Sequence, residues 1–205
     1  METLRLPPSA RERAAQVLAR AFFDYPVMAA HWPDRRRREK YLAWYLGCTV
    51  EYGLRYGEVY TTPDVAGVAI WLPPGRTRFT TWRYIRAGFA PAPLRMGLRR
   101  SFGQARRFED WTQKVHAEAA PGPHWYLWSL AVDPLQQGRG LGSLLMQPGL
   151  RAADAQRLPC YLETHDERNL PFYRRHGFDL ARAGTVPGSD LRFWGFLRPA
   201  GAGAA

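Results

Sequence analysis

The sequence predicts a mixed α/β fold, because strand-like and helix-like segments alternate along the chain. Residues 57–73, "GEVYTTPDVAGVAIWLP", are typical of two strands joined by a Pro-Asp turn. Residues 124–132, "HWYLWSLAV", form the near-continuous apolar run of a buried strand. A glycine-rich stretch then leads into a helical pattern, so strands lie both before and after a strand–turn–helix unit.

Composition indicates a folded protein rather than a disordered one. The chain has 205 residues, 46% of them hydrophobic, with eight Trp, ten Tyr and ten Phe. We expect one domain over residues 1–198 and a disordered tail over 199–205. The two cysteines, Cys48 and Cys160, show no disulfide or metal pattern and are expected to be buried thiols. Because no signal peptide or membrane span is evident, we expect a cytoplasmic protein without membrane partners.

The formal net charge is +11, almost all of it from arginine. A solvated basic surface explains this charge most simply, and a positive potential could also steer an anionic ligand such as a nucleotide. The basic run "RRRREK" at 35–40 is short and no nucleic-acid-binding motif accompanies it. Nucleic acid is therefore not an expected partner.

The first third of the chain predicts a strand, two helices and the hairpin. Leu4 and Leu6 fit a short strand, and Ser9–Glu12 has the capping-box pattern that opens a helix. This helix should end before Pro26, since proline disfavours helical geometry in the preceding residue. A second helix is expected after Asp34, with an apolar side that includes Leu42 and Leu46.

Residues 76–120 contain no strand pattern and are rich in Arg, Phe and Trp, so we expect a helical insertion that shapes a binding pocket. Pro91 and Pro93 separate its helix-like pieces. Beyond the glycine stretch, "PCYLET" predicts a strand, "RNLPFYRRHG" a short helix closed by Gly177, and "DLRFWGFL" a last strand.

The glycine stretch reads Gln137-Gly138-Arg139-Gly140-Leu141-Gly142. A strand, a glycine-rich turn and a helix form a general anion-binding device, because the free N–H groups of the first helical turn point at the anion. The spacing is neither the dinucleotide fingerprint nor the P-loop, which needs a Gly-Lys pair that the chain lacks. A tight turn with close helix packing is the structural alternative.

The pattern Q-x-x-G-x-G resembles the acetyl-CoA pyrophosphate loop of the GNAT N-acetyltransferases. "YLETHDERNLPFYRRHGF" resembles the second half of that family's motif, and "AFFDYP", "VAIWLPP" and "QGRGLGSLLMQPG" resemble the puromycin N-acetyltransferase subgroup. The likeness extends from residue 10 to 197 and is weakest across 76–120. It implies a central mixed, mostly antiparallel sheet, splayed around the cofactor and flanked by helices. It implies acetyl-CoA as cosubstrate and no metal.

The resemblance also implies which residues hold the cofactor. Backbone N–H groups between Gly138 and Ser143 would bind the pyrophosphate, and Asn169 would bond the pantetheine arm. That arm would pair like an added strand with the end of 124–132, unless this is an ordinary buried strand. Asn169 could instead cap a helix. The expected cofactor-binding residues are Leu130, Ala131, Val132, Gln137, Gly138, Arg139, Gly140, Leu141, Gly142, Ser143, Asn169 and Tyr173.

Four residues are expected to serve catalysis or acceptor binding. The Leu130 backbone N–H is the candidate oxyanion donor, and Tyr173 matches the family's acid that protonates the leaving thiolate, unless its ring only packs in the core. Glu163 is the candidate base, since a carboxylate in an apolar strand needs a reason to be there. A water relay or a surface-facing Glu163 is the alternative. Tyr25 is expected to line the amine pocket with Glu163, unless it is a loop aromatic covering the core.

These residues predict an acetyl-CoA-dependent N-acetyltransferase that acts on a primary amine of a small, apolar or aromatic molecule. A CoA-binding sensor without turnover and a peptide or protein N-acetyltransferase are the alternatives. Five scattered histidines show no metal-binding spacing. The chain is expected to be a monomer or a homodimer.

Overall fold

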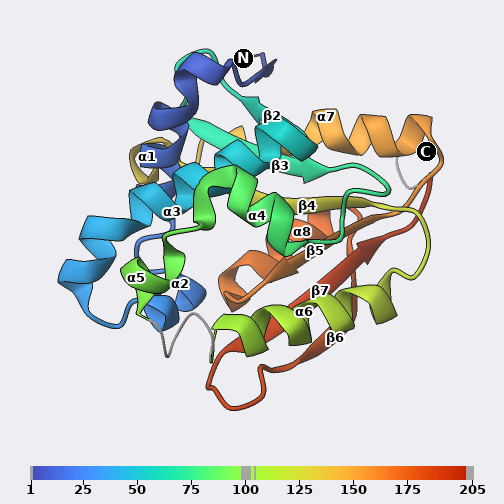
Figure 1. Cartoon of the computed structure of the whole chain (residues 1–205). Helices are drawn as coiled ribbons and strands as arrows, with labels where there is room; N and C mark the ends of the chain where they lie inside the picture. The colour runs from blue at the N-terminus through green and yellow to red at the C-terminus, as the bar shows by residue number, and fades with distance from the viewer. Residues whose placement is uncertain (1, 98–102, 104, 202–205) are drawn as a thin grey trace.

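The computed structural model describes residues 2–97, 103 and 105–201, and this part of the chain forms one seven-stranded sheet flanked by helices (Figure 1). The strand order is β1-β2-β3-β4-β5-β7-β6, and every neighbouring pair is antiparallel except β4 and β5. The strands are β1 (Leu4–Arg5), β2 (Glu58–Thr61), β3 (Gly67–Leu72), β4 (Trp125–Val132), β5 (Cys160–Thr164), β6 (Asp179–Thr185) and β7 (Arg192–Arg198). The predicted mixed α/β class is confirmed.

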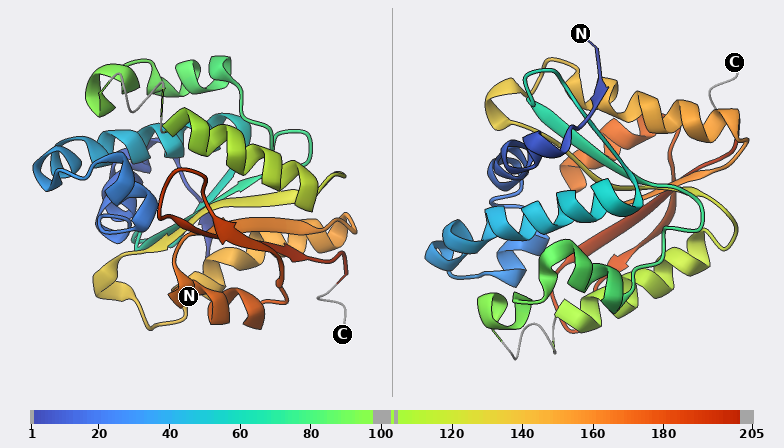
Figure 2. Two further views of the ribbon diagram at one scale, coloured as in Figure 1. Left: turned by 90° about the horizontal axis from the view of Figure 1, so that it is seen from below. Right: turned by 45° about the horizontal axis from the view of Figure 1, so that its top comes forward.

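The helices lie on both faces of this sheet. They are α1 (Arg11–Ala21), α2 (Pro26–His31), α3 (Arg35–Tyr56), α4 (Thr81–Tyr84), α5 (Ala92–Met96), α6 (Ala105–Ala119), α7 (Leu141–Ala155) and α8 (Leu170–Arg175). Short turns are η1 (Pro8–Ala10), the π-helical η2 (Ile85–Phe89), η4 (Pro134–Gln136) and η5 (Glu167–Asn169). Figure 2 shows α7 and α8 apart from α3, α4 and α6, with the sheet between them.

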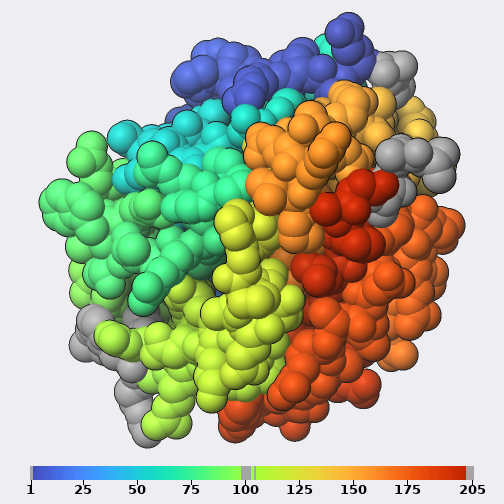
Figure 3. Space-filling model, turned by 90° about the vertical axis from the view of Figure 1, so that its right-hand side faces the viewer, coloured from blue at the N-terminus to red at the C-terminus, as the bar shows by residue number. Residues whose placement is uncertain are grey.

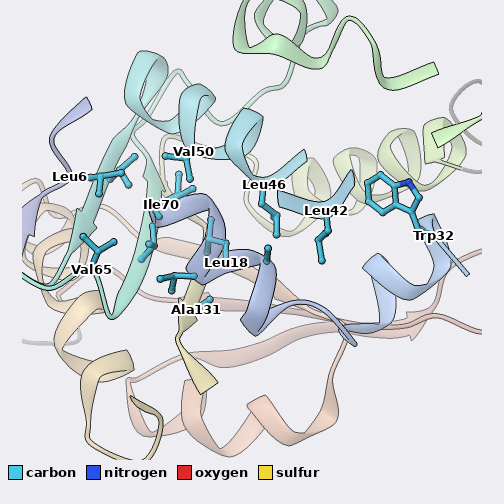
Figure 4. Packing of buried hydrophobic residues seen from close by; sticks show 14 of the residues in the cluster. Leu6, Leu18, Trp32, Leu42, Leu46, Val50, Val65, Ile70 and Ala131 are labelled. Carbon is cyan, nitrogen blue, oxygen red and sulfur yellow. The ribbon is translucent and has the colours of Figure 1, made fainter. Parts of the chain in front are cut away.

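Successive side chains of β3 point to opposite faces of the sheet and contribute to its two main hydrophobic clusters. Val68 and Ile70 pack with α1 and α3, as Figure 4 shows for Ile70 beside Leu18, Leu46 and Val50. Trp71 and Ala69 belong to the opposite cluster, which includes residues of α7 and α8. Side chains two positions apart share a face of a strand, so a buried central strand with all six residues covered supplies both layers.

The sheet opens between β4 and β5. These strands pair in parallel only at Trp125–Leu127 and Cys160–Leu162. In the β3–β4 pairing, Ile70 lies opposite Ser129 and Trp71 opposite Leu127, so Trp128 is an extra, bulged residue in β4. Beyond the bulge, β4 follows β3 and separates from β5. The edge of β4 that faces β5 is thus unpaired by strands from Trp128 to Val132.

The N-terminal helices agree with the sequence except at the capping box. Asp34 caps α3 as expected, accepting hydrogen bonds from the N–H groups of Arg36 and Arg37. Ser9, however, lies inside η1, and α1 begins at Arg11 without a side-chain cap. The reason is Pro8, which starts the helical turn one residue before the serine. Helix α2 was not predicted.

Pro148 lies inside α7, which continues as one helix through the proline. The residue beside it explains the pair: a Cβ on Gly149 would lie 2.2 Å from the indole ring of Trp71. Glycine at 149 therefore lets α7 pack directly on the central strand β3, and this contact offsets the hydrogen bond that proline removes.

The C-terminal end contains a strand that the sequence analysis did not predict and part of the expected tail. Strand β6 was not predicted, and all seven of its residues are exposed, as on an edge strand with a weak apolar pattern. Of the expected tail, 199–201 is described, with a turn at 200–201, and 202–205 lies outside the described residues. Within the described part of the chain, no helix is long and apolar enough to cross a membrane.

Candidate active site

Three glycines shape the loop between β4 and α7 for two different reasons. Gly138 and Gly140 have φ of 77° and 76°, a region that residues with a Cβ rarely adopt. Gly142 has no such strain, but a Cβ there would lie 3.3 Å from the ring of Phe172 in α8. The first two glycines thus allow the backbone turn, and the third allows α7 to pack closely on α8.

The start of α7 is open to an anion. Gly140 is its N-cap, no side chain caps it, and no acidic residue occupies its first turn. The first N–H groups of a helix have no partner within the helix, and the helix dipole places partial positive charge there. Space is open around the α-carbons of Gly138 and Gly140, where an added Cβ would meet no atom within 4 Å. These residues fit a pyrophosphate.

The unpaired edge of β4 leads from this loop toward the middle of the molecule. At the loop end of this edge, the amide of Gln137 donates to the carbonyl oxygen of Val132 at 3.2 Å. Asp133 follows, and its carboxylate accepts hydrogen bonds from Arg20 of α1 and from the N–H of Leu135. The Arg20 guanidinium lowers the pKa of Asp133. Side chains thus hold the end of the strand, while Leu130 and Ala131 keep a backbone edge without a β5 partner.

A cavity of about 1430 Å³ lies on the other side of this opening. Its walls come from α1–α2, α3, the segment 77–96, α6, β4 and β5, so the predicted helical insertion 76–120 forms much of the lining where it is described. Residues 98–102 and 104 of that insertion lie outside the described residues. Five residues expected to serve the site line this one cavity: Tyr25, Leu130, Glu163, Asn169 and Tyr173. Ala131, Val132 and residues 137–143 do not line it and lie farther along β4 and its loop.

Glu163 faces the cavity from β5. Tyr161 and Glu163 share a face of the strand, while Cys160 and Leu162 pack on the opposite side against the α7–α8 core. The Tyr126 hydroxyl donates to the Glu163 carboxylate at 3.4 Å. Burial raises the pKa of Glu163 from an ordinary 4.5 to about 8, and the negative charge of Glu109 contributes. The expected surface-facing alternative is thereby excluded.

Tyr173 combines a packed ring with a hydroxyl at the cavity. Its ring centroid lies 5.9 Å from that of Phe196 in the core, and the residue is 8% exposed. No described residue forms a hydrogen bond with its hydroxyl. Burial raises the pKa of Tyr173 well above its ordinary value, so the hydroxyl stays protonated and able to donate.

Tyr25 and Asn169 meet at Thr164, the last residue of β5. The Asn169 amide donates to the Thr164 hydroxyl at 3.0 Å, and the Tyr25 hydroxyl lies 3.3 Å from the same oxygen. Tyr25 also accepts a hydrogen bond from the N–H of His165 at 2.7 Å. Burial raises the pKa of Tyr25 to about 12. Asn169 occupies the N-cap position of α8, but its side chain makes no cap hydrogen bond there. The network fixes the separating end of β5.

Three buried histidines form hydrogen bonds within the protein. His116 and His124 are buried and joined Nε2 to Nε2 at 2.7 Å, and burial lowers the pKa of both. His165 bonds the carbonyl oxygen of Arg192, and burial lowers its pKa to about 4. In the described part of the chain, no group of three or more His, Cys, Asp or Glu side chains could hold a metal ion.

The sequence analysis missed Glu109 of α6, which also lines the cavity. Its Oε1 accepts hydrogen bonds from the Tyr84 hydroxyl at 3.0 Å and from the Gln113 amide at 3.1 Å. Burial raises the pKa of Glu109 from 4.5 to about 7. Only its place on an amphipathic helix could have signalled it, because the face that it occupies depends on how α6 packs.

An open sheet, an uncapped glycine-rich helix start and a cavity lined by a partly buried carboxylate are the features expected of an N-acetyltransferase. The chain belongs to the acetyltransferase (GNAT) family, whose sequence profile matches residues 22–178. This family uses acetyl-CoA as donor.

Known relatives agree with this assignment. The chain is similar to an uncharacterised N-acetyltransferase of Schizosaccharomyces pombe, with 26% identity over 87% of this chain and 74% of that protein. A solved structure described as histone acetyltransferase HPA2 and related acetyltransferase from Corynebacterium glutamicum has a TM-score of 0.67 and 20% identity, covering 97% and 96% of the two chains. The ribosomal-protein-S18-alanine N-acetyltransferase of Escherichia coli has a TM-score of 0.52 and 14% identity, covering 97% and 92%. These two likenesses concern the fold.

Proposed function

We propose that the protein transfers the acetyl group of acetyl-CoA to a primary amine of a small, apolar or aromatic molecule, by direct attack on the thioester. The observation that carries this proposal is the cavity, which Glu163, Leu130 and Tyr173 line together with further aromatic residues such as Tyr25, Phe79 and Trp128. The resemblance of "AFFDYP" and "VAIWLPP" to puromycin N-acetyltransferases supports a small-molecule acceptor.

The cofactor-binding residues form a continuous path. The N–H groups between Gly138 and Ser143 would hold the pyrophosphate at the start of α7. The unpaired edge of β4 from Leu130 to Val132 would pair with the pantetheine arm like an added strand. Asn169 would donate to the arm where β5 separates from β4. When bound, acetyl-CoA supplies an activated thioester carbonyl.

Three groups would act on the reacting atoms. The Glu163 carboxylate takes a proton from the acceptor ammonium, because only the neutral amine has a free electron pair. The Leu130 N–H donates to the carbonyl oxygen as negative charge develops on it. The Tyr173 hydroxyl donates to the departing sulfur, which leaves more readily as it gains a proton. Tyr25 would line the part of the cavity that holds the acceptor amine. The aromatic side chains in the cavity wall favour an acceptor that is flat or apolar, because such a molecule can stack on them.

The test is thiol release from acetyl-CoA with a panel of amines. Phenethylamine and tryptamine represent the proposed acceptors, spermidine a linear polyamine, and an alanine-initiated peptide a protein N-terminus. We expect the aromatic amines to have the highest kcat/KM. Faster acetylation of spermidine or of the peptide would overturn the small aromatic acceptor. CoA binding without thiol release for any amine would instead identify a CoA sensor.

A further inference from the structure

We infer that the cavity contains a second cation-binding position at Glu109, so that the acceptor is an aromatic amine carrying a second, basic nitrogen. This inference rests on the proposed function, because it concerns the acceptor of the same site. It begins from two carboxylates inside a protein with a formal net charge of +11. Neither Glu109 nor Glu163 forms an ion pair with any residue that the structure describes.

Among the described residues, only one of the two carboxylate oxygens of Glu109 has hydrogen-bond partners. Tyr84 and Gln113 both donate to Oε1, and among the described residues Oε2 has no hydrogen-bond partner. Glu109 is partly buried, so this oxygen has lost part of its solvation energy. A ligand that brings a cation to this oxygen would restore that energy, whereas a neutral group would not and an anion would be repelled.

Aromatic rings beside Glu109 favour the same kind of ligand. Tyr84, Tyr45 and Phe89 line the cavity, and Phe89 has ring-centroid distances of 5.1 Å to Tyr84 and 5.2 Å to Tyr45. The charge of Glu109 contributes to the raised pKa of Tyr45, which places the two groups within electrostatic reach. A carboxylate among aromatic faces suits an alkylammonium, which pairs with the charge and contacts the π-electrons.

Glu109 and Glu163 serve two separate positions. They lie on α6 and on β5, and they share no hydrogen-bond partner among the described residues: Tyr84 and Gln113 bond the former, Tyr126 the latter. The reacting amine must lie beside Leu130 and Glu163, where the sheet opens. A nitrogen at Glu109 is thus a second nitrogen of the same molecule.

The surrounding charges would not block such an acceptor. The basic residues that line the cavity include Arg78, Arg106 and Lys114, which are exposed to solvent, while the two carboxylates are partly buried. Figure 3 shows the yellow-green surface of α6 between the green segment that includes α4 and the orange to red C-terminal strands. The negative charges of the two carboxylates therefore have the larger electrostatic effect inside the cavity, where the dielectric constant is lower. The positive charges of the basic residues act mainly at the outer surface, where salt screens them.

The test uses two amines of nearly equal shape. In 4-[(dimethylamino)methyl]benzylamine the second nitrogen is tertiary and cannot form a stable amide, and in 4-isobutylbenzylamine a CH group replaces it. We expect wild-type kcat/KM to be about ten-fold higher for the diamine. Glu109→Gln should bring this ratio to near one, since the amide can still accept from Tyr84 but lacks the charge. Glu118→Gln, on the exposed side of the same helix, is the matched control and should keep the ratio.

A binding experiment separates this inference from the proposed function. Calorimetric titration of the diamine into the CoA-bound protein should show about ten-fold weaker binding for Glu109→Gln than for Glu118→Gln. Equal binding by the two variants, or a preference that survives Glu109→Gln, would overturn the second position. Tight binding lost in Glu109→Gln, without acetylation of either amine, would support the position and contradict the enzyme. Melting temperatures of both variants verify that they fold.

Discussion

At the scale of the residue, the proposed role of Glu163 as the base would couple catalysis to pH. Its pKa near 8 means that roughly a tenth of the carboxyl groups are ionised at neutral pH in the protein without ligands. We expect wild-type kcat/KM to rise with pH through about 8. Glu163→Gln should lose roughly a hundred-fold near pH 8, with partial recovery at higher pH as the amine loses its own proton. A variant with the wild-type pH profile would remove Glu163 as the base.

The same pKa has a consequence for stability. Between the ordinary 4.5 and about 8, the folded protein holds a proton on Glu163 that the unfolded chain has lost. The contribution of this group to the free energy of unfolding therefore falls as pH rises through that window. We expect Glu163→Gln to become progressively more stable than wild type from about pH 5 to pH 8, as urea unfolding at several pH values would measure. A constant difference would contradict the raised pKa.

Tyr173 is expected to act through its hydroxyl and not only through its ring. Tyr173→Phe keeps the ring that packs on Phe196 but removes the proton donor. Turnover should fall by roughly ten- to a thousand-fold, while the melting temperature and CoA affinity remain near wild type. Single-turnover kinetics would isolate the chemical step. An unchanged chemical step would make Tyr173 a packing residue.

At the scale of the element, the glycine sequence at the start of α7 shapes the helix N-terminus that is proposed to bind the pyrophosphate. The turn needs positive φ at Gly138 and Gly140, and the helix leaves its first N–H groups without a cap. Residues of α7 also contact β3 through Gly149 and α8 through Gly142. The helix is thus held on two sides, and its N-terminus is presented at a fixed place beside the open edge of β4.

Gly140→Asp tests this arrangement, because it places a negative charge at the proposed pyrophosphate position. CoA should raise the melting temperature of wild type, since a ligand that binds only the folded state stabilises it. The variant should lose this shift. Some loss of stability is expected because aspartate replaces glycine at positive φ, so Gly140→Asn, which has nearly the same shape without the charge, is the matched control. Equal stabilisation of Gly140→Asp and wild type by CoA would contradict the assignment.

At the scale of the whole molecule, the opening of the sheet decides where a ligand can go. Only three residue pairs join β4 to β5, and the bulge at Trp128 turns β4 away from β5 beyond them. The loop of α7 lies at one side of the opening and the large cavity at the other. A donor laid along β4 would therefore meet an acceptor that enters from the cavity, with Glu163 and Tyr173 at the junction.

The sequence by itself determined the elements that local chemistry dictates. Backbone strain explains the glycine loop, and side-chain hydrogen bonding explains the cap at Asp34. The strand pattern explains the buried strand before the loop and the side of β5 that carries Glu163. These signals act over a few residues, so the amino-acid order contains them.

Tertiary structure alone decided the rest. Edge strand β6 has no buried face to leave a pattern, and Gly149 is explained only by the indole of Trp71, 78 positions earlier in the chain. Glu109 became a cavity residue because α6 packs with that turn facing α4, which brings Tyr84 to its carboxylate. Such contacts join segments that are distant along the chain, and their energies depend on the packing of whole elements rather than on any local preference.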